Sequence, residues 1–154
     1  MRELKRILLA EDNPDDVELT LEALQVNQLA NEVVVVRDGA EALDYLYRRG
    51  DFASRPAGLP AVVLLDLKMP KVDGLEVLRQ LKSDESLRTT PVVMLTSSRE
   101  EADLVRSYQL GVNAYVVKPV DFGDFIEAVR NLGLFWAVVN EPPLPDGSAA
   151  RSRL

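Results

Sequence analysis

The stretch VVLLDLKMPKVDG, residues 62–74, decides the fold of this chain. Its first four residues are apolar without alternation, a pattern typical of a strand that is buried on both faces of a parallel sheet. Pro70 and the pair Asp73-Gly74 predict that the chain turns directly after this strand. Because an ionised carboxylate is costly to bury without a partner, we expect Asp66 to lie at an open strand end or beside a cation.

Similar apolar runs lie on both sides of this stretch, and each is followed by apolar residues at helical spacing. Strands are predicted at residues 6–10, 33–36, 62–66, 91–96 and 113–117, and helices at about 14–27, 38–50, 75–82, 98–111 and 121–139. Strands that alternate with helices predict an α/β fold, here a doubly wound, five-stranded parallel sheet with helices on both faces. We expect the flavodoxin-like strand order 2-1-3-4-5.

Residues that favour helix ends mark several of these boundaries. Asp38, Ser98 and Asp121 are each suited to accept a hydrogen bond from the first turn of a helix. Gly50 and Gly111 are predicted to end the second and fourth helices, since glycine readily takes the left-handed conformation found there.

The composition is that of an ordinary globular protein and excludes several kinds of chemistry. The 154 residues are 47% hydrophobic and 28% charged, and no apolar run is long enough to cross a bilayer. The N-terminal residues do not form a signal peptide pattern, so we expect a cytoplasmic protein. The net charge of −7 argues against nucleic-acid binding. The lack of His and Cys excludes zinc sites, Ser-His-Asp triads and cysteine nucleophiles.

The chain is predicted to form one domain over residues 1–139, followed by a flexible tail over residues 140–154 that begins with the proline-rich sequence NEPPLPDG. Residues 51–60 form a loop that is long for a connection between a helix and a strand. Too few residues follow the last predicted helix to form a DNA-binding domain, so we expect the output to be protein–protein contact.

The predicted strand order places the carboxyl ends of four strands side by side. The residues that follow or end these strands include Glu11, Asp12, Asp66, Thr96 and Lys118. Three neighbouring acids repel one another, and Mg²⁺ together with a lysine would relieve that repulsion. Such a set is suited to hold a phosphoryl group near Asp66, whose carboxylate can act as a nucleophile and form an aspartyl phosphate.

Four motifs at these strand ends resemble those of response-regulator receiver domains of two-component signalling. The resemblance covers about residues 5–134 and rests on ILLAEDN at 7–13, LLDLKMPKVDG at 64–74, MLTS at 94–97 and YVVKP at 115–119. It implies that Asp66 accepts a phosphoryl group from the histidine of a partner kinase. It also implies that Asp12, Asp66 and the backbone carbonyl of Lys68 bind Mg²⁺, with Glu11 contributing nearby through water.

The same resemblance assigns roles to three further residues. Thr96 and Lys118 would contact the phosphoryl oxygens, and Tyr115 matches the aromatic residue that turns inward as Thr96 moves toward the phosphate. The bond between Lys118 and Pro119 is expected to be cis. Phosphorylation would then change a surface formed by the fourth helix, the fifth strand and the fifth helix.

Two positions depart from the common family pattern. The acidic pair is Glu11-Asp12, where Asp-Asp is common, and Lys68 stands two residues after the acceptor, where we expect it to affect the lifetime of the phosphate. Residues 51–60, 133–136 and 140–143 resemble those of stand-alone regulators that partner phytochrome-type histidine kinases. Phe135 and Trp136 suit either the local core or a homodimer contact.

Three other functions remain as alternatives. A hydrolase or phosphatase with an aspartyl-phosphate intermediate would need a second acid, and Lys68 occupies a position where one would be useful. A flavin-binding domain would need a glycine-rich loop after the first strand, which the sequence lacks. A receiver-like interaction module that is never phosphorylated would not need the complete set of acids, threonine and lysine. We therefore expect a phosphoacceptor switch rather than an enzyme with a dedicated substrate.

Overall fold

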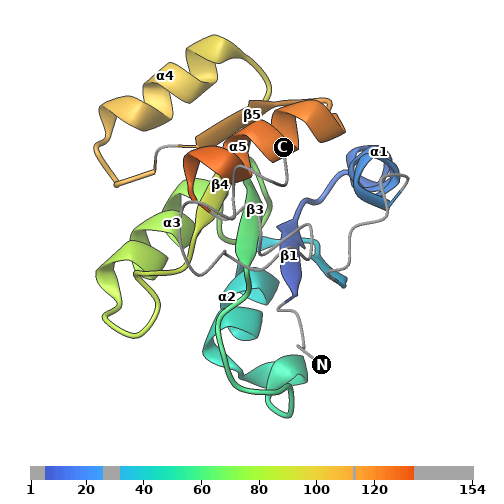
Figure 1. The fold of residues 1–154 in the computed structure, drawn as a ribbon. Coiled ribbons are helices and arrows are strands. Elements are labelled where there is room, and N and C mark those ends of the chain that lie inside the picture. The colour runs from blue at the N-terminus through green and yellow to red at the C-terminus, as the bar shows by residue number, and fades with distance from the viewer. Residues whose placement is uncertain (1–5, 26–31, 113, 134–154) are drawn as a thin grey trace, which may run out of the picture.

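The computed structural model describes residues 6–25, 32–112 and 114–133. Its five parallel strands form one sheet in the order β2-β1-β3-β4-β5 (Figure 1). The strands are β1 (Ile7–Ala10), β2 (Val33–Val36), β3 (Val62–Asp66), β4 (Val92–Thr96) and β5 (Ala114–Val117). The α/β class and the strand order predicted from the sequence are confirmed. The register pairs Asp66 with Leu95 and Thr96 with Val117, so the carboxyl ends of neighbouring strands are aligned.

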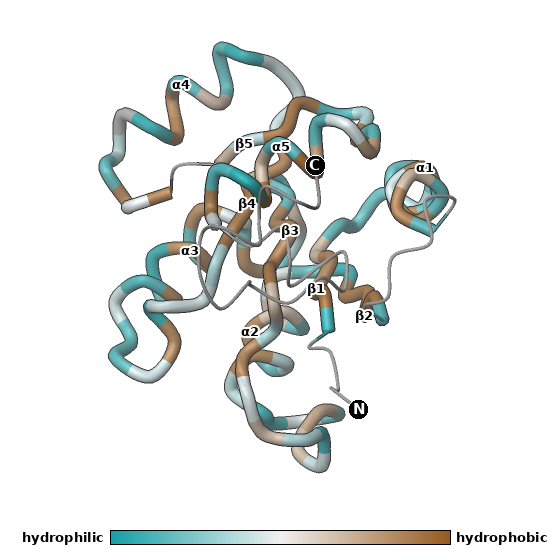
Figure 2. The backbone as a smooth tube through the Cα atoms, viewed as in Figure 1, coloured by the Kyte–Doolittle hydropathy of each residue, from teal (hydrophilic) through white to brown (hydrophobic). Residues whose placement is uncertain are grey.

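Helices cover both faces of the sheet, because successive side chains of a strand point to opposite sides. The helices are α1 (Pro14–Gln25), α2 (Gly39–Tyr47), α3 (Gly74–Ser83), α4 (Arg99–Ser107) and α5 (Phe122–Asn131). Leu8 and Leu65 pack on the face covered by α2, α3 and α4, whereas Leu9 and Leu64 pack on the face covered by α1 and α5. Figure 2 shows the apolar residues concentrated in the strands between these layers.

The predicted helix starts are confirmed by side-chain caps. Asp38, Ser98 and Asp121 each accept a hydrogen bond from the backbone N–H three residues further along, at the start of α2, α4 and α5. Asp73 caps α3 in the same way. Each bond satisfies one of the backbone donors that a helix N-terminus otherwise leaves without a partner.

The predicted ends of the second and fourth helices are wrong. α2 ends at Tyr47 because Arg48 takes the left-handed conformation, with φ 57°, and its N–H bonds back to the last turn of the helix. A short 3-10 helix, Gly50–Phe52, then opens the long loop between α2 and β3. α4 also ends well before Gly111, because Gln109 has a φ of 55° and turns the chain out of the helix.

One arginine holds the loop between α2 and β3 in place. Arg55 donates hydrogen bonds to the carbonyl oxygens of Tyr45 (2.7 Å), Leu46 (3.4 Å), Pro56 (2.8 Å) and Gly58 (3.1 Å). Its guanidinium also lies 4.2 Å from the centroid of the Tyr45 ring. A planar group with several donors is suited to bind diverging carbonyls, and this one joins the loop to α2.

Some predictions fall outside the residues that the structure describes. These are the tail over residues 140–154, the extension of the last helix to residue 139, and the aromatic pair Phe135 and Trp136. In the described ranges, no helix combines the length and the apolar character needed to span a membrane.

Candidate functional site

The site lies where the carboxyl ends of β1, β3, β4 and β5 meet. Asp66 and Thr96 are the last residues of β3 and β4, while Glu11 and Lys118 directly follow β1 and β5. Backbone bonds continue the sheet beyond the strands: the Lys118 N–H donates to the Thr96 carbonyl at 2.8 Å, and the Glu11 N–H donates to the Val36 carbonyl at 3.0 Å. These bonds carry residues that are far apart in the sequence to one edge of the sheet.

Lys118 is the cation at the centre of this site. Its Nζ lies 3.0 Å from Asp16 Oδ2, 3.2 Å from Glu11 Oε1 and 3.4 Å from Asp66 Oδ1. Burial by itself lowers the pKa of Lys118, but the contacts with Asp16, Asp66 and Glu11 outweigh burial, so the pKa of Lys118 is raised. The lysine is therefore a permanent positive charge beside the Asp66 carboxylate.

Three acids surround the space in front of Lys118. Carboxylate oxygens of Glu11, Asp12 and Asp66 all lie within 4.8 Å of one another. Asp12 is exposed, whereas Glu11 and Asp66 are buried, with 0% and 4% of their surface exposed. Three hard oxygen donors this close together, open to solvent on one side, fit a small divalent cation such as Mg²⁺ or Mn²⁺.

The buried Glu11 has the most strongly altered acidity of the three. Burial and the neighbouring Asp66 carboxylate raise the pKa of Glu11 to about 7, although the Asn13 N–H, which donates to Glu11 Oε2 at 3.1 Å, and Lys118 oppose that rise. The physical reason is an excess of negative charge in a buried place, which a bound cation would remove. The glutamate that departs from the common acidic pair thus still lies inside the acid cluster.

Thr96 is fully buried, with 0% of its surface exposed. Its hydroxyl has no hydrogen-bond partner among the described residues. A buried hydroxyl without a partner is unusual and unfavourable, and at this strand end it is available to bond a group that enters beside Asp66.

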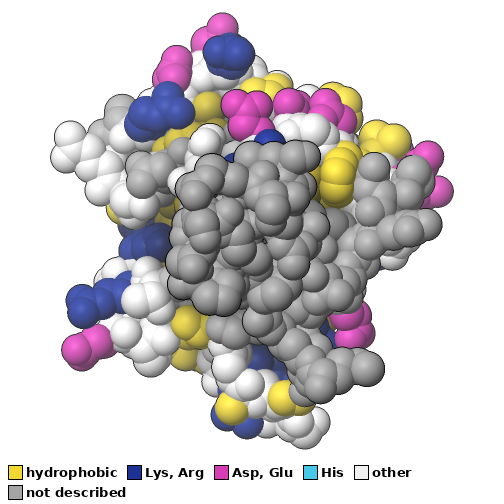
Figure 3. All heavy atoms as spheres, in the orientation of Figure 1, with side chains coloured by type: hydrophobic (Ala, Val, Ile, Leu, Met, Phe, Trp, Pro, Cys, Tyr) yellow, Lys and Arg dark blue, Asp and Glu magenta, His cyan; other side chains and the backbone are white. Residues whose placement is uncertain are grey.

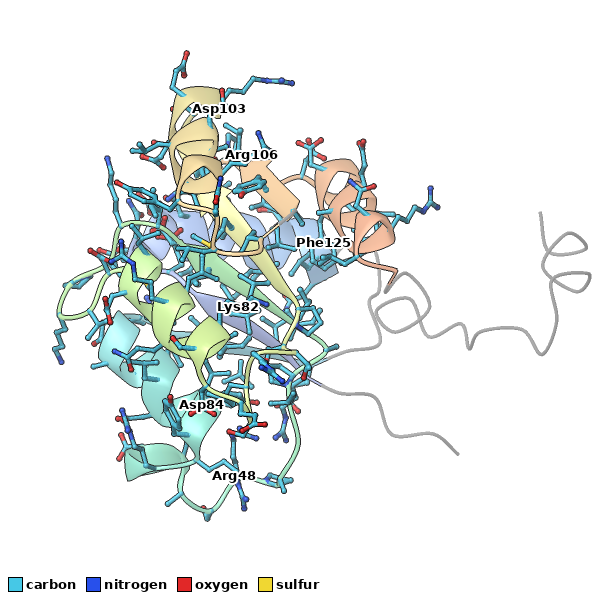
Figure 4. All side chains as sticks on the ribbon, turned by 90° about the vertical axis from the view of Figure 1, so that its left-hand side faces the viewer. Arg48, Lys82, Asp84, Asp103, Arg106 and Phe125 are labelled. Atoms are coloured by element: carbon cyan, nitrogen blue, oxygen red, sulfur yellow. The ribbon has the colours of Figure 1, made fainter. Side chains whose placement is uncertain are left out.

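Tyr115 lies on β5, half-buried, next to α4. Its hydroxyl donates to the Val112 carbonyl at 2.9 Å, and the Arg106 guanidinium lies 4.6 Å from its ring centroid. Arg106 in turn pairs with Asp103 at 3.0 Å on the same helix (Figure 4). Tyr115 therefore links β5 to α4 through its contact with Arg106.

Lys68 directs its side chain away from the acid cluster. Its Nζ lies 3.4 Å from Glu101 Oε2, and 81% of its side chain is exposed. Glu101 also accepts hydrogen bonds from the Ser97 N–H at 2.8 Å and the Ser97 hydroxyl at 3.1 Å. Lys68 thus connects the loop after β3 to the start of α4.

The turn after β3 is packed tightly against the candidate acceptor. The Gly74 N–H donates to the Leu67 carbonyl at 2.8 Å, and a Cβ added at Gly74 would lie 2.0 Å from the Asp66 carbonyl oxygen. Only glycine fits this approach, which explains the Asp-Gly pair noted in the sequence. The bond between Lys118 and Pro119 is cis, as expected.

Sequence reasoning missed Asp16, which makes the shortest of the three ion pairs of Lys118. Asp16 lies in the first turn of α1, where an acid is usually explained by the helix dipole. A signal was available, because a helix that begins directly after β1 must start beside the strand ends. The structure thus brings together Glu11, Asp12, Asp66 and Lys118 as predicted, and adds a fourth acid.

Comparison with known proteins agrees with this geometry. A family model described as the response regulator receiver domain matches residues 7–130 of the chain. The response regulator Rcp1 of Synechocystis sp. is 39% identical over 132 residues, which are 86% of this chain and 88% of Rcp1. A crystal structure of the Mn²⁺-bound form of Rcp1 has a TM-score of 0.69 at 37% identity, covering 92% of this chain and 99% of that chain.

Two further solved structures are similar over nearly the whole chain. The bacteriophytochrome response regulator AtBRR has a TM-score of 0.87 at 68% identity, covering 91% of this chain and 100% of its own. The phosphorylated cyanobacterial phytochrome response regulator RcpA has a TM-score of 0.71 at 41% identity, covering 94% and 100%. Since the family model spans most of the sequence and the fold and strand-end motifs agree with it, this chain belongs to the response-regulator receiver domain family, with phytochrome-associated response regulators among its relatives.

Proposed function

We propose that this chain is a phosphoacceptor switch in which Asp66 takes a phosphoryl group from a phosphorylated histidine of a sensor kinase. The observation that carries this proposal is the contact of Lys118 Nζ with Asp66 Oδ1 at 3.4 Å, inside a cluster of acids that fits a divalent cation. A carboxylate is already a nucleophile when ionised, and the lysine beside it offers a charge to an incoming phosphoryl oxygen. The relatives named as phytochrome response regulators support the same reading.

The transfer is a displacement at phosphorus. An Asp66 carboxylate oxygen attacks, an O–P bond forms, and the N–P bond of the donor breaks with its electron pair passing to the histidine nitrogen. Lys118 contacts a phosphoryl oxygen, and the Thr96 hydroxyl donates a hydrogen bond to another. Dephosphorylation is a separate displacement: water attacks the phosphorus, the O–P bond to Asp66 breaks with its electron pair passing to the carboxylate oxygen, and inorganic phosphate leaves.

Glu11, Asp12, Asp66 and the backbone carbonyl of Lys68 would hold Mg²⁺ in this proposal, with Glu11 acting through water. The bound cation would offset the negative charge of the acids and of the phosphoryl oxygens. The clustered carboxylate oxygens support this assignment, and the Mn²⁺-bound form of Rcp1 is a relative that binds a similar ion. We expect Asp66 to accept and release a phosphoryl group without turnover of a dedicated substrate, and in this proposal the chain is a switch rather than an enzyme.

The signal leaves the site through Thr96 and Tyr115. As Thr96 bonds the phosphoryl group, Tyr115 turns inward and changes the surface formed by α4, β5 and α5. A cavity of about 500 Å³ on that surface is lined by residues of all three elements, including Arg99, Arg106 and Tyr115. Figure 3 shows acidic and basic side chains together at the α4 end of the molecule, which suits a protein partner better than nucleic acid. A homodimer formed through this surface and residues 135–136 belongs to the same proposal.

Phosphorylation is tested with acetyl phosphate and Mg²⁺, with the product followed by intact mass. We expect one phosphoryl group per chain, released by hydroxylamine as an acyl phosphate is, and absent when EDTA replaces Mg²⁺. Asp66→Asn should lose the adduct, whereas the exposed Asp51→Asn should keep it as a matched control. An adduct that survives in Asp66→Asn would refute the assignment of Asp66. Repeated turnover of a small phosphate ester would instead favour a phosphatase.

The kinase partner is tested by phosphotransfer from several purified histidine kinases. We propose a phytochrome-type kinase, because relatives at 68% and 41% identity are phytochrome response regulators. The chain should then be phosphorylated faster by a phytochrome kinase than by unrelated sensor kinases. Equal rates from all of them would contradict this part of the proposal and leave the role of Asp66 untouched.

A further inference from the structure

Asp16 is a fourth acid of the site, which neither the sequence motifs nor the proposed chemistry uses. Its Oδ2 lies 3.0 Å from Lys118 Nζ, closer than Glu11 at 3.2 Å or Asp66 at 3.4 Å. The backbone fixes its place: Asn13 Oδ1 accepts hydrogen bonds from the N–H groups of Asp15 at 2.8 Å and Asp16 at 3.2 Å. The start of α1 thus holds the Asp16 carboxylate against the lysine.

We propose that Asp16 is a positioning residue that shares Lys118 with Asp66 before phosphorylation and releases it to the phosphoryl group afterwards. This inference rests on the proposed function, since it concerns how readily the same site accepts a phosphoryl group. Asp16 restrains the site by keeping Lys118 divided among three carboxylates. Among the described residues, no other Lys or Arg side chain forms an ion pair with these acids.

Exposure explains why the lysine would leave Asp16 rather than Glu11. The Asp16 side chain is 27% exposed, whereas the side chains of Glu11 and Asp66 are 0% and 5% exposed. When Lys118 turns toward a phosphoryl oxygen, water can solvate the Asp16 carboxylate in its place. The same loss at Glu11 would leave a buried charge without its cation, which is far less favourable.

Charge adds to this restraint. Asp16 and Asp66 both contact one ammonium group, so Asp16 lies close to the place where an anionic phosphoryl group arrives. A carboxylate there repels the incoming group and competes with it for Lys118. Removing the Asp16 charge should therefore strengthen phosphoryl binding, although it also removes an ion pair from the resting protein.

The test compares Asp16→Asn with Asp15→Asn, its neighbour in the same helical turn. Both variants remove one negative charge from the start of α1, but Asp15 is exposed and, in the described part of the chain, forms no hydrogen bond or ion pair with Lys118. Two quantities are measured with Mg²⁺ present: the dissociation constant of beryllofluoride by calorimetry, and the rate of phosphorylation by acetyl phosphate by intact mass. Asp16→Asn should lower the dissociation constant of beryllofluoride and raise the phosphorylation rate, each by roughly three- to tenfold, which is the scale expected for one partly screened charge.

A second pair of variants separates positioning from simple charge. In a Lys118→Met background, Asp16→Asn should lose most of its gain in beryllofluoride affinity, because the shared cation is gone and only the direct repulsion by the Asp16 carboxylate remains. The Mg²⁺ affinity should shift equally, and less than twofold, in Asp16→Asn and Asp15→Asn. A merely structural role for Asp16 would alter the unfolding midpoint without this dependence on Lys118.

Each outcome has a distinct meaning. If the unsubstituted protein gains no labile phosphoryl group, the proposed function fails. If it does, but Asp16→Asn behaves like Asp15→Asn or is phosphorylated more slowly, only the role of Asp16 fails. If the full gain from Asp16→Asn persists without Lys118, Asp16 acts only by repelling the incoming anion and the positioning role is overturned.

Discussion

The stability of the metal-free protein should depend on pH through Glu11, and the variant Glu11→Gln should remove that dependence. Glu11 has no exposed surface and contacts both Lys118 and Asp66, with Asp12 and Asp16 completing the charged groups around it. Its pKa rises from 4.5 to about 7 in the folded protein, chiefly because of burial. Folding therefore changes how strongly this one group holds a proton.

The sign follows from proton binding. Between the two pKa values the folded state holds the Glu11 proton and the unfolded state has lost it, so stability is fully present at lower pH and falls as pH rises through about 7. One pKa unit corresponds to about 1.4 kcal/mol, so the largest loss is about 3 kcal/mol. This is a large fraction of the free energy of unfolding of an ordinary domain.

The assay is urea unfolding in EDTA at several values from pH 5 to pH 8, for the unsubstituted protein and for Glu11→Gln. The difference between the two free energies of unfolding isolates Glu11, because other titrating groups contribute equally to both. We expect this difference to move by about 2–3 kcal/mol across the range, in favour of Glu11→Gln at high pH. The exposed Glu18→Gln serves as a matched control and should show no such change.

Magnesium should reverse the slope of the unsubstituted protein, because a bound cation stabilises the ionised form of Glu11. With excess Mg²⁺, stability should rise rather than fall above pH 6. A flat difference curve in EDTA would show that burial does not raise the pKa of Glu11. The account of an acid cluster short of positive charge would then be wrong.

Two further predictions concern the framework around the site. Gly74→Ala should destabilise the fold by roughly 2–4 kcal/mol, since its Cβ would overlap the Asp66 carbonyl. Gly123→Ala is the control and should destabilise much less, because the nearest contact of its Cβ would be 3.3 Å. Equal melting temperatures for the two variants would contradict the close approach at Gly74. Arg55→Lys should lower the free energy of unfolding in urea by about 1–3 kcal/mol, because an ammonium cannot bond all four carbonyls. The exposed Arg37→Lys is the control, and equal stability of the two variants would show that Arg55 does not hold the loop.

Much of the fold could be predicted because its signals are local. An unbroken apolar run such as residues 62–65 indicates a strand covered on both faces, and the caps at Asp38, Ser98 and Asp121 need only a side chain and the next turn of backbone. The helix ends were harder. Arg48 and Gln109 take left-handed conformations that glycine usually adopts, so the glycines further along were misleading markers.

The sequence alone also determined which residues would gather at the site, because parallel strands place their carboxyl ends along one edge and the strand ends carry Asp66, Thr96 and Lys118. Only the tertiary structure decided how those side chains share their contacts: Lys118 lies nearest to Asp16, and Lys68 pairs with Glu101 instead of joining the acids. The physical reason is range. Strand periodicity and backbone register are set by neighbouring residues, whereas the partner of a long charged side chain depends on distances of a few tenths of an ångström between elements that the sequence places far apart.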